Sequence, residues 1–468
     1  MPDLYQELSK LADSDMYPFH MPGHKRNLES TPMKGAFRCD ITEIDDYDNL
    51  HDAKGIILEA QQRANRIYGA EETFFLVNGS TCGVLSAVSA IVPEGGRILA
   101  ARGSHKSFYN AAYLKNLDIK YLPYKVNTKY QIPETYGSED VEKALDESIQ
   151  AVFITSPTYE GKCADIRGIV EVCHKRGIPV VIDAAHGAHF GLGAKSALPE
   201  NAVSQGADLV IHSVHKTLPS MTQTALLHVQ GNLVDRVKLK RFLSIYQTSS
   251  PSYVLMASID LCMKYIEENG KEFVDRLLKY RKLLEDAAKE CRFIEIPGRT
   301  IIPDAAKVLI YVKNAAMTGH ELYDILREEY KLQLEMAGEK YALAIISGWD
   351  TREGIDRLIS AIRQIDLGIS AKKTLKPEEE QIKVVSLPEQ ELSIQSAWDT
   401  EKESALIQDA VGRISGEFIN LYPPGIPLIV PGERFSKELV CDISRYIKEG
   451  LTVQGIVNRK EVICVKPK

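Results

Sequence analysis

The sequence is poor in several features that mark particular classes of protein. Its eight cysteines form no Cys-x-x-Cys pair, which argues against a disulfide framework or a zinc site and favours reduced thiols. The only two tryptophans, Trp349 and Trp398, give no functional signal beyond packing. No apolar run reaches the roughly 18 residues of a membrane span, and the longest, around 84–92, predicts a core helix.

An excess of basic charge is also missing. The chain has 57 basic against 64 acidic residues, a net charge of −7, which argues against nucleic acid or an anionic membrane as a partner. The first residues lack a basic segment followed by an apolar core, so we expect no secretory signal and a cytoplasmic location. With 468 residues the chain is long enough for two or three domains.

The order of the expected elements divides the chain. Short β-rich runs alternate with helical ones from about residue 73 to 230, which predicts an α/β fold with a mostly parallel sheet, helices on both faces and ligands at the carboxyl ends of strands. We predict the following divisions: an N-terminal arm at 1–53, a large domain at 54–290, a smaller α+β domain at 291–370, an exposed linker at 371–393 and a C-terminal α+β domain at 394–468.

The most informative position is Lys216, which follows a buried strand predicted over 207–212. A strand of this kind delivers the amine to a polar strand end, and such a lysine is a candidate for imine formation. A second strand, over 178–182, ends in Asp183 and leads into His186. One acid, one amine and an imidazole would therefore meet at neighbouring strand ends.

A third element suits a phosphate group. A strand over 73–77 runs into Ser80 and Thr81 and then into an apolar helix. The free N–H groups of such a strand-to-helix turn favour an anion, and Ser213 and His215 can add further donors. Together with Lys216 for an aldehyde and Asp183 for a protonated pyridine nitrogen, this set predicts a pocket for pyridoxal 5'-phosphate.

A metal site is the alternative interpretation of Asp183, His186 and His189, since their spacing of three resembles a helical chelate. The residues between them are small, include Gly187 and follow a strand, and no cysteine or second cluster joins them. We therefore predict no metal there. His212 lies within its strand and is expected to be packed.

Several motifs together resemble the bacterial ornithine/lysine/arginine decarboxylases of the aspartate-aminotransferase-like pyridoxal-phosphate fold (fold type I). The resemblance runs through most of the chain, in the segments 21–25 (Met-Pro-Gly-His-Lys), 40–43, 78–81, 102–107, 183–187, 213–216, 247–253 and 422–433. It implies a large domain with a mostly parallel sheet, a smaller α+β domain and a C-terminal α+β domain.

The resemblance also implies roles for single residues. Lys216 would hold the cofactor through an imine, Asp183 would bind the pyridine nitrogen and His105 would stack on the ring. The phosphate would be surrounded by the hydroxyl and imidazole groups of Ser80, Thr81, Ser213 and His215. His186 would lie beside the ring or the substrate carboxylate, where it or the released Lys216 could return a proton to Cα.

The expected reaction is decarboxylation of arginine, lysine or ornithine to agmatine or a diamine, in polyamine biosynthesis, with arginine as the first choice. The distal cation of such a substrate needs a carboxylate, for which Glu433 is the first candidate and Glu43 and Asp45 follow. Two alternatives stay open: an aminotransferase or lyase of the same fold, which would need a carboxylate-binding arginine such as Arg413, and a non-catalytic paralogue. We expect Arg413 to be structural.

Long members of the family carry an N-terminal wing domain, for which we see no counterpart here. The expected assembly is therefore a homodimer with the active site at the interface. Residues of the arm, His24 and Lys25, or the run 248–250 would then reach the neighbouring site. All of these remain implications of the resemblance.

Overall fold

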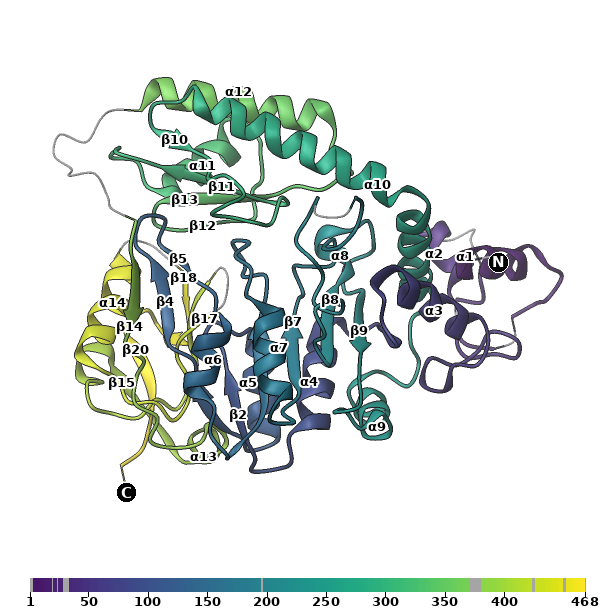
Figure 1. Cartoon of the computed structure of the whole chain (residues 1–468), viewed down its shortest axis with the longest axis horizontal. Helices are drawn as coiled ribbons and strands as arrows, with labels where there is room; N and C mark the ends of the chain where they lie inside the picture. The colour runs from purple at the N-terminus through teal and green to yellow at the C-terminus, as the bar shows by residue number, and fades with distance from the viewer. Residues whose placement is uncertain are drawn as a thin grey trace.

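The computed structural model describes residues 3–18, 20–22, 24–27, 33–194, 197–369, 380–422, 426–448 and 452–467 (Figure 1). At its centre lies a seven-stranded sheet. In spatial order its strands are β1 (Glu72–Leu76), β9 (Ala225–Val229), β8 (Leu209–Ser213), β7 (Val180–Asp183), β6 (Ile149–Thr155), β2 (Arg97–Ala100) and β3 (Asp118–Tyr121). The five strands from β8 to β3 run parallel, and only β9 runs against its neighbours β1 and β8. The mostly parallel sheet predicted from the sequence is confirmed.

Helices cover both faces of this sheet. One core joins it to α4 (Gly79–Ile91), α5 (Lys106–Leu114) and α9 (Arg236–Tyr246), and the opposite core joins it to α6 (Ser138–Ala144) and α7 (Ile166–His174). In β8, Leu209 and Ile211 enter the first core and Val210 the second, as the period of two requires. The apolar, β-branched strands are therefore buried on both sides.

A long helix, α10 (Tyr253–Lys289), leads away from the large sheet to a smaller one. The smaller sheet is antiparallel, in the order β10 (Ile294–Glu295), β11 (Lys307–Val312), β13 (Tyr341–Ile345) and β12 (Met336–Ala337). Its helices are α11 (Gly319–Glu328) and α12 (Arg352–Gly368), and α12 packs beside α10 at the top of Figure 1. The start of β11 contacts the loop after β7 through Lys307 and His186, which brings the small sheet to the carboxyl ends of the large-sheet strands.

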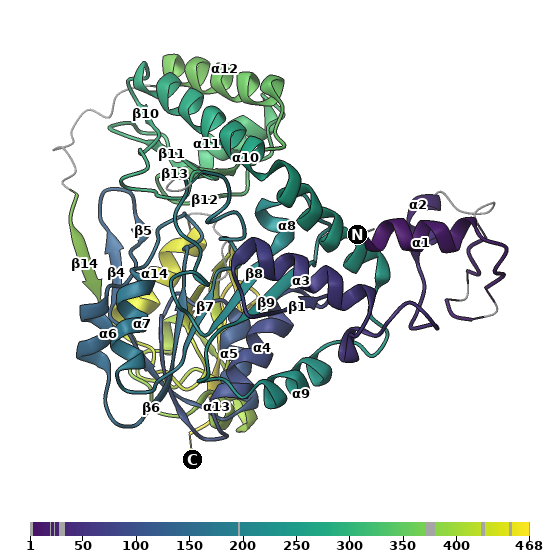
Figure 2. The ribbon, with the colours of Figure 1, turned by 45° about the vertical axis from the view of Figure 1, so that its right-hand side comes forward.

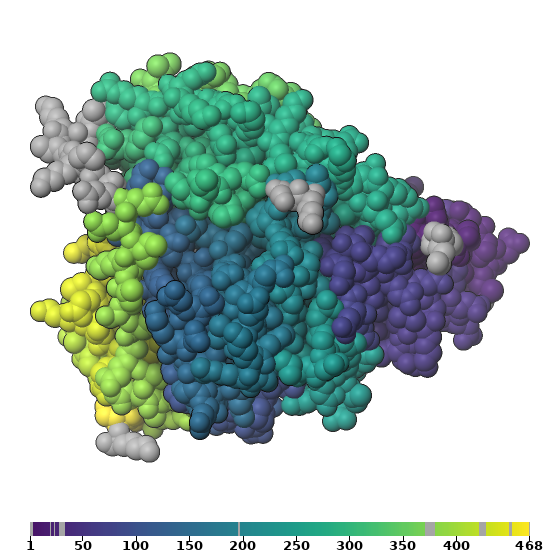
Figure 3. All heavy atoms as spheres, in the orientation of Figure 1, coloured from purple at the N-terminus to yellow at the C-terminus, as the bar shows by residue number. Residues whose placement is uncertain are grey.

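The C-terminal part packs against the large sheet on the side away from the arm (Figure 3). It contains α13 (Ile394–Asp399), η2 (Ile407–Asp409) and α14 (Lys437–Lys448). Its strands are β15 (Lys402–Leu406), β20 (Glu461–Val465) and β19 (Ile456–Val457) in one sheet, and β17 (Ile426–Ile429), β16 (Ile419–Tyr422) and β18 (Thr452–Gln454) in another. Contacts between α13 and α5 join it to the large domain.

The segment predicted as a linker, 371–393, contains a strand among its described residues. β14 (Ile382–Val385) pairs with β4 (Tyr124–Asn127), which also pairs with β5 (Ile132–Pro133). Three of the four residues of β14 are β-branched, which favours a strand even though the strand is exposed. The rest of the domain boundaries predicted above stay predictions.

The described residues of the N-terminal arm include three short helices, and the arm projects from the body beside α3 (Ile56–Tyr68) (Figure 2). They are α1 (Leu4–Asp13), α2 (Lys34–Cys39) and η1 (Leu50–Asp52). Leu4, Leu8 and Leu11 are buried at helical spacing, and this signal was missed. In the described residues, no helix combines the length and apolar character that crossing a membrane requires.

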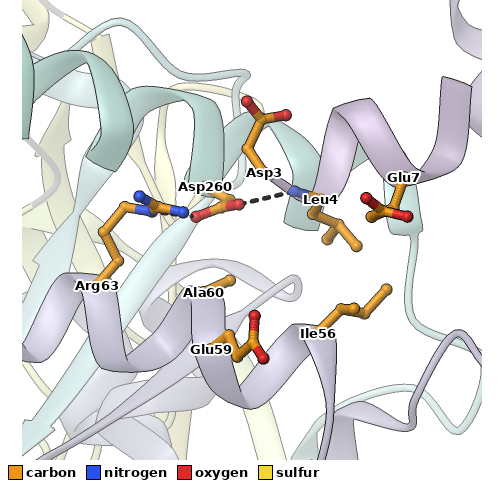
Figure 4. Close-up of a pocket in the computed structure, with 8 residues that line it drawn as sticks. All are labelled: Asp3, Leu4, Glu7, Ile56, Glu59, Ala60, Arg63 and Asp260. Atoms are coloured by element: carbon orange, nitrogen blue, oxygen red, sulfur yellow. Dashed lines mark hydrogen bonds and ion pairs between the residues drawn. The ribbon is translucent and has the colours of Figure 1, made fainter. Parts of the chain in front are cut away.

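Between α1, α3 and α10 lies a cavity of about 300 Å³ (Figure 4). Asp260 is buried at its wall and accepts hydrogen bonds from Nε of Arg63 and the N–H of Leu4, both at 2.9 Å. Since these contacts tie the arm to α3 and α10, the arm is fixed where it joins the body.

Candidate active site

The parallel register of β7 and β8 brings the predicted acid and amine to one edge of the large sheet. Asp183 is the last residue of β7 and pairs with Ile211 of β8. After Ser213, the chain turns into a short helix, α8 (Val214–Thr217), which carries Lys216. The two strand ends therefore face the same space, as expected for parallel neighbours.

The amine of Lys216 contacts the imidazole of His186. Its Nζ lies 3.0 Å from Nε2 of His186, which is buried in the loop after β7. Burial lowers the pKa of Lys216 below its ordinary value, and the charges of Asp183 and Glu335 partly oppose this. Burial, followed by the charges of Lys307 and Lys216, also lowers the pKa of His186. A lysine of lowered pKa beside a neutral imidazole is suited to nucleophilic chemistry.

Asp183 is buried, and one of its oxygens accepts a hydrogen bond from the N–H of Ala185 at 3.1 Å. Its negative charge raises the pKa values of both Lys216 and His105 against the effect of burial. The carboxylate is thus close enough to act on both groups, and the structure brings these three predicted residues together.

The predicted phosphate turn lies at the start of α4. Oγ of Ser80 is 2.5 Å from Oγ of Ser213, so this turn meets the end of β8. Gly79 has φ of 74°, a left-handed conformation that glycine adopts without strain. Asn78 precedes the helix without capping it, because its side-chain oxygen accepts from the N–H of Thr248 at 3.2 Å. Thr81 is exposed at the same helix start.

The two other predicted histidines have defined ring orientations. Nδ1 of His105 accepts from the N–H of Ser107 at 3.2 Å and caps α5, and part of the residue is exposed. The surroundings of His105 lower its pKa, chiefly by desolvation. Nδ1 of His215 donates to the carbonyl of Thr224 at 2.9 Å, which leaves Nε2 of that ring as an acceptor.

Comparisons with known proteins agree with this geometry. The family model "Orn/Lys/Arg decarboxylase, major domain" matches residues 2–336, and the model of the C-terminal domain of the same family matches residues 378–452. The chain belongs to the Orn/Lys/Arg decarboxylase family. The chain is 31% identical to the arginine decarboxylase of Bacillus subtilis, over 97% of this chain and 95% of that protein.

The solved structures show the same fold. The lysine decarboxylase LdcF of Francisella novicida matches with a TM-score of 0.82 at 16% identity, over 100% of this chain and 81% of that one. An alanine–glyoxylate aminotransferase of Nostoc sp. matches with a TM-score of 0.54 at 14% identity, over 66% and 86%. The decarboxylase therefore has the fold type I architecture that the sequence predicted.

Glu433 corrects one expectation about this decarboxylase. It was expected to bind the distal cation of the substrate, yet none of its surface is exposed. Its two oxygens accept from the guanidinium of Arg102 at 2.6 and 2.8 Å, and one also accepts from the N–H of Val430 at 2.9 Å. With both oxygens bound inside the protein, Glu433 is not available to a substrate cation in this arrangement. The partner of Glu433 is therefore Arg102, which folding brings to it from a distant part of the sequence, and not a neighbour in the sequence.

The three residues considered as metal ligands have other partners. His186 lies between two lysines, and Nε2 of His189 contacts the buried Asp304 at 2.7 Å. Within the described ranges, no group of three or more histidine, cysteine, aspartate or glutamate side chains is arranged to hold a metal ion. His212 is buried in β8 as expected, 3.0 Å from His228 through Nδ1.

Three residues of the site were missed from the sequence. Lys307 of β11 is fully buried, and its Nζ lies 2.7 Å from Nδ1 of His186. The ring of Tyr159 lies 4.6 Å from that of His186, and its hydroxyl donates to the exposed carboxylate of Glu335. A lysine at the start of an otherwise apolar strand was the one available signal for Lys307. The sequence offered no comparable signal for Tyr159 or Glu335.

The residues expected to reach a neighbouring subunit are bound within the arm or exposed. Nε2 of His24 lies 3.2 Å from Asp40, and Lys25 donates to the carbonyl of His20. The run 248–250 is exposed beside the phosphate turn. Of the two arm acids, Glu43 lies close enough to Tyr253 for its negative charge to add to the effect of burial in raising the pKa of that tyrosine. Asp45 is exposed. Arg413 pairs with Glu403.

Proposed function

We propose that this protein removes the α-carboxyl group of a basic amino acid, with arginine as the preferred substrate and pyridoxal 5'-phosphate as the cofactor. The observation that carries the proposal is the contact of Lys216 with His186 next to the buried Asp183. The family relationship supports the reaction type, and the relatives named arginine decarboxylase support the substrate. The products would be agmatine and carbon dioxide, which fits a role in polyamine synthesis.

The residues at the strand ends fit the cofactor by their chemistry. Lys216 offers an amine of lowered pKa for the aldehyde, and Asp183 offers a buried carboxylate for the pyridinium nitrogen. The uncapped start of α4, with Ser80 and Ser213, offers N–H and O–H donors for the phosphate. When bound, the cofactor supplies an electron sink for the pair released when a bond to Cα breaks.

The protein side chains would then direct which bond breaks and where a proton returns. His105, which is partly exposed and feels the charges of Asp183 and Lys216, would contact the face of the cofactor. Reprotonation of Cα needs an acid, and Lys216 and His186 are the nearby groups that can carry the proton. Loss of the carboxylate as carbon dioxide leaves an electron pair at Cα, and the two lysines that contact His186 would supply positive charge beside that position.

Glu335 replaces Glu433 as the candidate partner of the distal cation. It is exposed and its charge reaches Lys216, while the hydroxyl of Tyr159 holds it beside His186. A carboxylate at this position would pair with a guanidinium or ammonium group. This assignment and the preference for arginine belong to the proposal.

We also propose that the protein works as a homodimer in the cytoplasm, with each active site completed by the neighbouring subunit. The exposed run 248–250 beside the phosphate turn and the projecting arm support shared sites (Figure 2). Eight cysteines without disulfides support a reducing compartment.

The same-fold alternatives have less support. An aminotransferase or carbon–carbon or carbon–sulfur lyase would hold the α-carboxylate with an arginine, yet Arg413 is already paired with Glu403. A non-catalytic paralogue would have no use for Lys216, Asp183 and His105 grouped at one sheet edge.

The cofactor and the substrate are tested separately. Protein loaded with pyridoxal 5'-phosphate is expected to show a visible absorbance band that borohydride removes, with the added mass located on the peptide containing Lys216. Lys216→Ala should show neither. Initial rates with arginine, lysine and ornithine, followed by mass spectrometry of the amine products, are expected to give the highest kcat/KM for arginine. A higher value for lysine or ornithine would overturn the substrate choice, and 2-oxo acid products would overturn the reaction.

A further inference from the structure

A fully buried lysine lies behind the candidate active site. Lys307 begins β11, and 0% of its surface is exposed. Its stem packs so closely on Gly161 that an added Cβ there would lie 2.8 Å from Cγ of Lys307. Its Nζ lies 2.7 Å from Nδ1 of His186 and 5.1 Å from the ring centre of Tyr159. Burying a lysine amine is costly, so its contact with His186 requires an explanation.

The two contacts of His186 restrict where its proton lies. Nδ1 faces Lys307 at 2.7 Å, and Nε2 faces Lys216 at 3.0 Å. Burial and the two lysine charges lower the pKa of His186, which favours the neutral ring. A neutral imidazole has one N–H and one acceptor nitrogen, and an ammonium group can only donate. The acceptor nitrogen must therefore face whichever lysine is charged.

The surrounding carboxylates favour a charged Lys307. Burial, together with the positive charge of Lys216, lowers its pKa to about 8, and the charges of Asp304, Glu335 and Glu160 oppose that effect. When Lys216 is uncharged, its contribution is lost and the proton on Lys307 is held more firmly. Lys307 therefore keeps its proton at neutral pH. Lys216, in contrast, must be an uncharged amine to react with an aldehyde. In this arrangement Lys307 donates to Nδ1, and the Nε2–H bond of His186 points to Lys216.

A second contact fixes the same elements together. His189 and Asp304 are each three positions from His186 and Lys307, and they meet through a buried contact of 2.7 Å. The contacts His186–Lys307 and His189–Asp304 thus both join the loop after β7 to the start of β11. This pairing holds the small sheet against the strand ends of the large one.

We propose that Lys307 is a positioning residue that fixes His186 in the tautomer with its proton on Nε2, directed at Lys216. The inference rests on the proposed function, because it takes Lys216 as the reacting lysine. Lys307 acts through the imidazole, in the way that a hydrogen bond at one ring nitrogen sets the role of the other. Docking of the small sheet would then be a condition for correct protonation at the reacting atoms.

The direct test is the nitrogen NMR spectrum of cofactor-loaded protein labelled with ¹⁵N-histidine. The His186 signals are assigned by their loss in His186→Gln. In the wild type, Nε2 is expected to be protonated and Nδ1 unprotonated, and Lys307→Met should convert this into a mixture of tautomers. Lys129→Met is the control, because the amine of Lys129 lies over the ring of Tyr130 as that of Lys307 lies over Tyr159, while its hydrogen-bond partners are Tyr130 and Glu295 and not His186. An unchanged tautomer in folded Lys307→Met would overturn the proposal.

A titration of the wild type keeps the proposal testable if Lys307→Met does not fold. The groups that face Lys307 are Asp304, Glu160, Glu335, His186 and Lys216. Raising the pH through about 8 removes the proton from Lys307, so the His186 tautomers are expected to mix above that pH. A single Nε2–H tautomer that persists to about pH 10 would contradict the inference.

Kinetics separate a positioning role from a structural one. Lys307→Met is expected to lower kcat about 100-fold with little change in KM, whereas Lys129→Met should retain both. Loss of activity with an unchanged tautomer would make Lys307 structural and overturn the inference. If the wild type releases no carbon dioxide but shows the fixed tautomer, the proposed function fails and the inference about His186 stands.

Discussion

At the scale of single residues, Glu433 and Arg102 form an ion pair in which neither side chain is accessible to more than 2%. Burial raises the pKa of Glu433, and its pairing with Arg102 opposes this. Glu433→Gln would leave the buried guanidinium without its counter-charge. We expect the variant to lose about 3 kcal/mol in free energy of unfolding, measured by urea denaturation.

Glu403→Gln is the matched control, because its pair with Arg413 is partly exposed. It should cost at most about 1 kcal/mol. Equal effects of the two substitutions would mean that the buried pair has no special role in stability.

Glu335 gives a prediction about substrate binding. If its carboxylate pairs with the distal cation, Glu335→Gln should raise the KM for arginine about 10-fold or more, with kcat changed little. Glu339→Gln, an exposed glutamate in the same segment, should leave KM unchanged. A fall in kcat alone in Glu335→Gln would assign the residue to the chemical step instead of to substrate recognition.

The sequence predicted the residues whose position follows from local structure. Lys216, Asp183 and Ser80 each stand at the end of a recognisable strand, so their meeting at one sheet edge could be foreseen. Glu433 and Lys307 could not, because each depends on a partner more than 100 positions away. When tertiary packing buries a charged side chain, the residues next to it in the sequence show no pattern that would reveal the burial.

At the scale of elements, β8 and β9 carry a pair of buried histidines. Nδ1 of His212 lies 3.0 Å from Nε2 of His228, whose Nδ1 lies 2.8 Å from the hydroxyl of Thr73. Burial lowers the pKa of His212 to about 3, and it also lowers the pKa of His228. These strands therefore hold both rings neutral.

The depressed pKa predicts loss of stability in acid. Between pH 6.5 and 3 the unfolded chain binds a proton at His212 that the folded protein does not, so stability falls as the pH falls through this range. The difference in free energy of unfolding between wild type and His212→Gln should shrink by about 2 kcal/mol from pH 7 to pH 5. A constant difference for His212→Gln would contradict this account.

Periodicity located most of these elements in advance. The strands before Asp183, Lys216 and the phosphate turn, and the apolar helix after that turn, all follow from apolar runs and turn residues. β14 was missed because the polar composition around it masked a short β-branched run. The helix α1 was not predicted, because the glycines and prolines that follow it made the whole arm look irregular.

At the scale of the whole molecule, the candidate active site lies where the small sheet meets the carboxyl ends of the large sheet (Figure 1). The exposed run 248–250 beside the phosphate turn leads us to propose that a second subunit completes the site. Composition alone could suggest a large enzyme with several domains, but not the contacts between its sheets.

Subunit mixing tests this shared site. In a two-fold dimer, a mixture of Lys216→Ala with Ser249→Arg would contain heterodimers with one intact site, so about a quarter of wild-type activity should return. Each variant alone should be inactive. No recovery after verified exchange of subunits would mean that each chain completes its own site.

The central claim is decarboxylation at Lys216, and the most direct measurement is carbon dioxide release from carboxyl-labelled arginine by the cofactor-loaded protein. The account predicts one carbon dioxide per agmatine formed by the wild type and neither product from Lys216→Ala. Conversion of arginine without carbon dioxide, or equal release by Lys216→Ala, would contradict it.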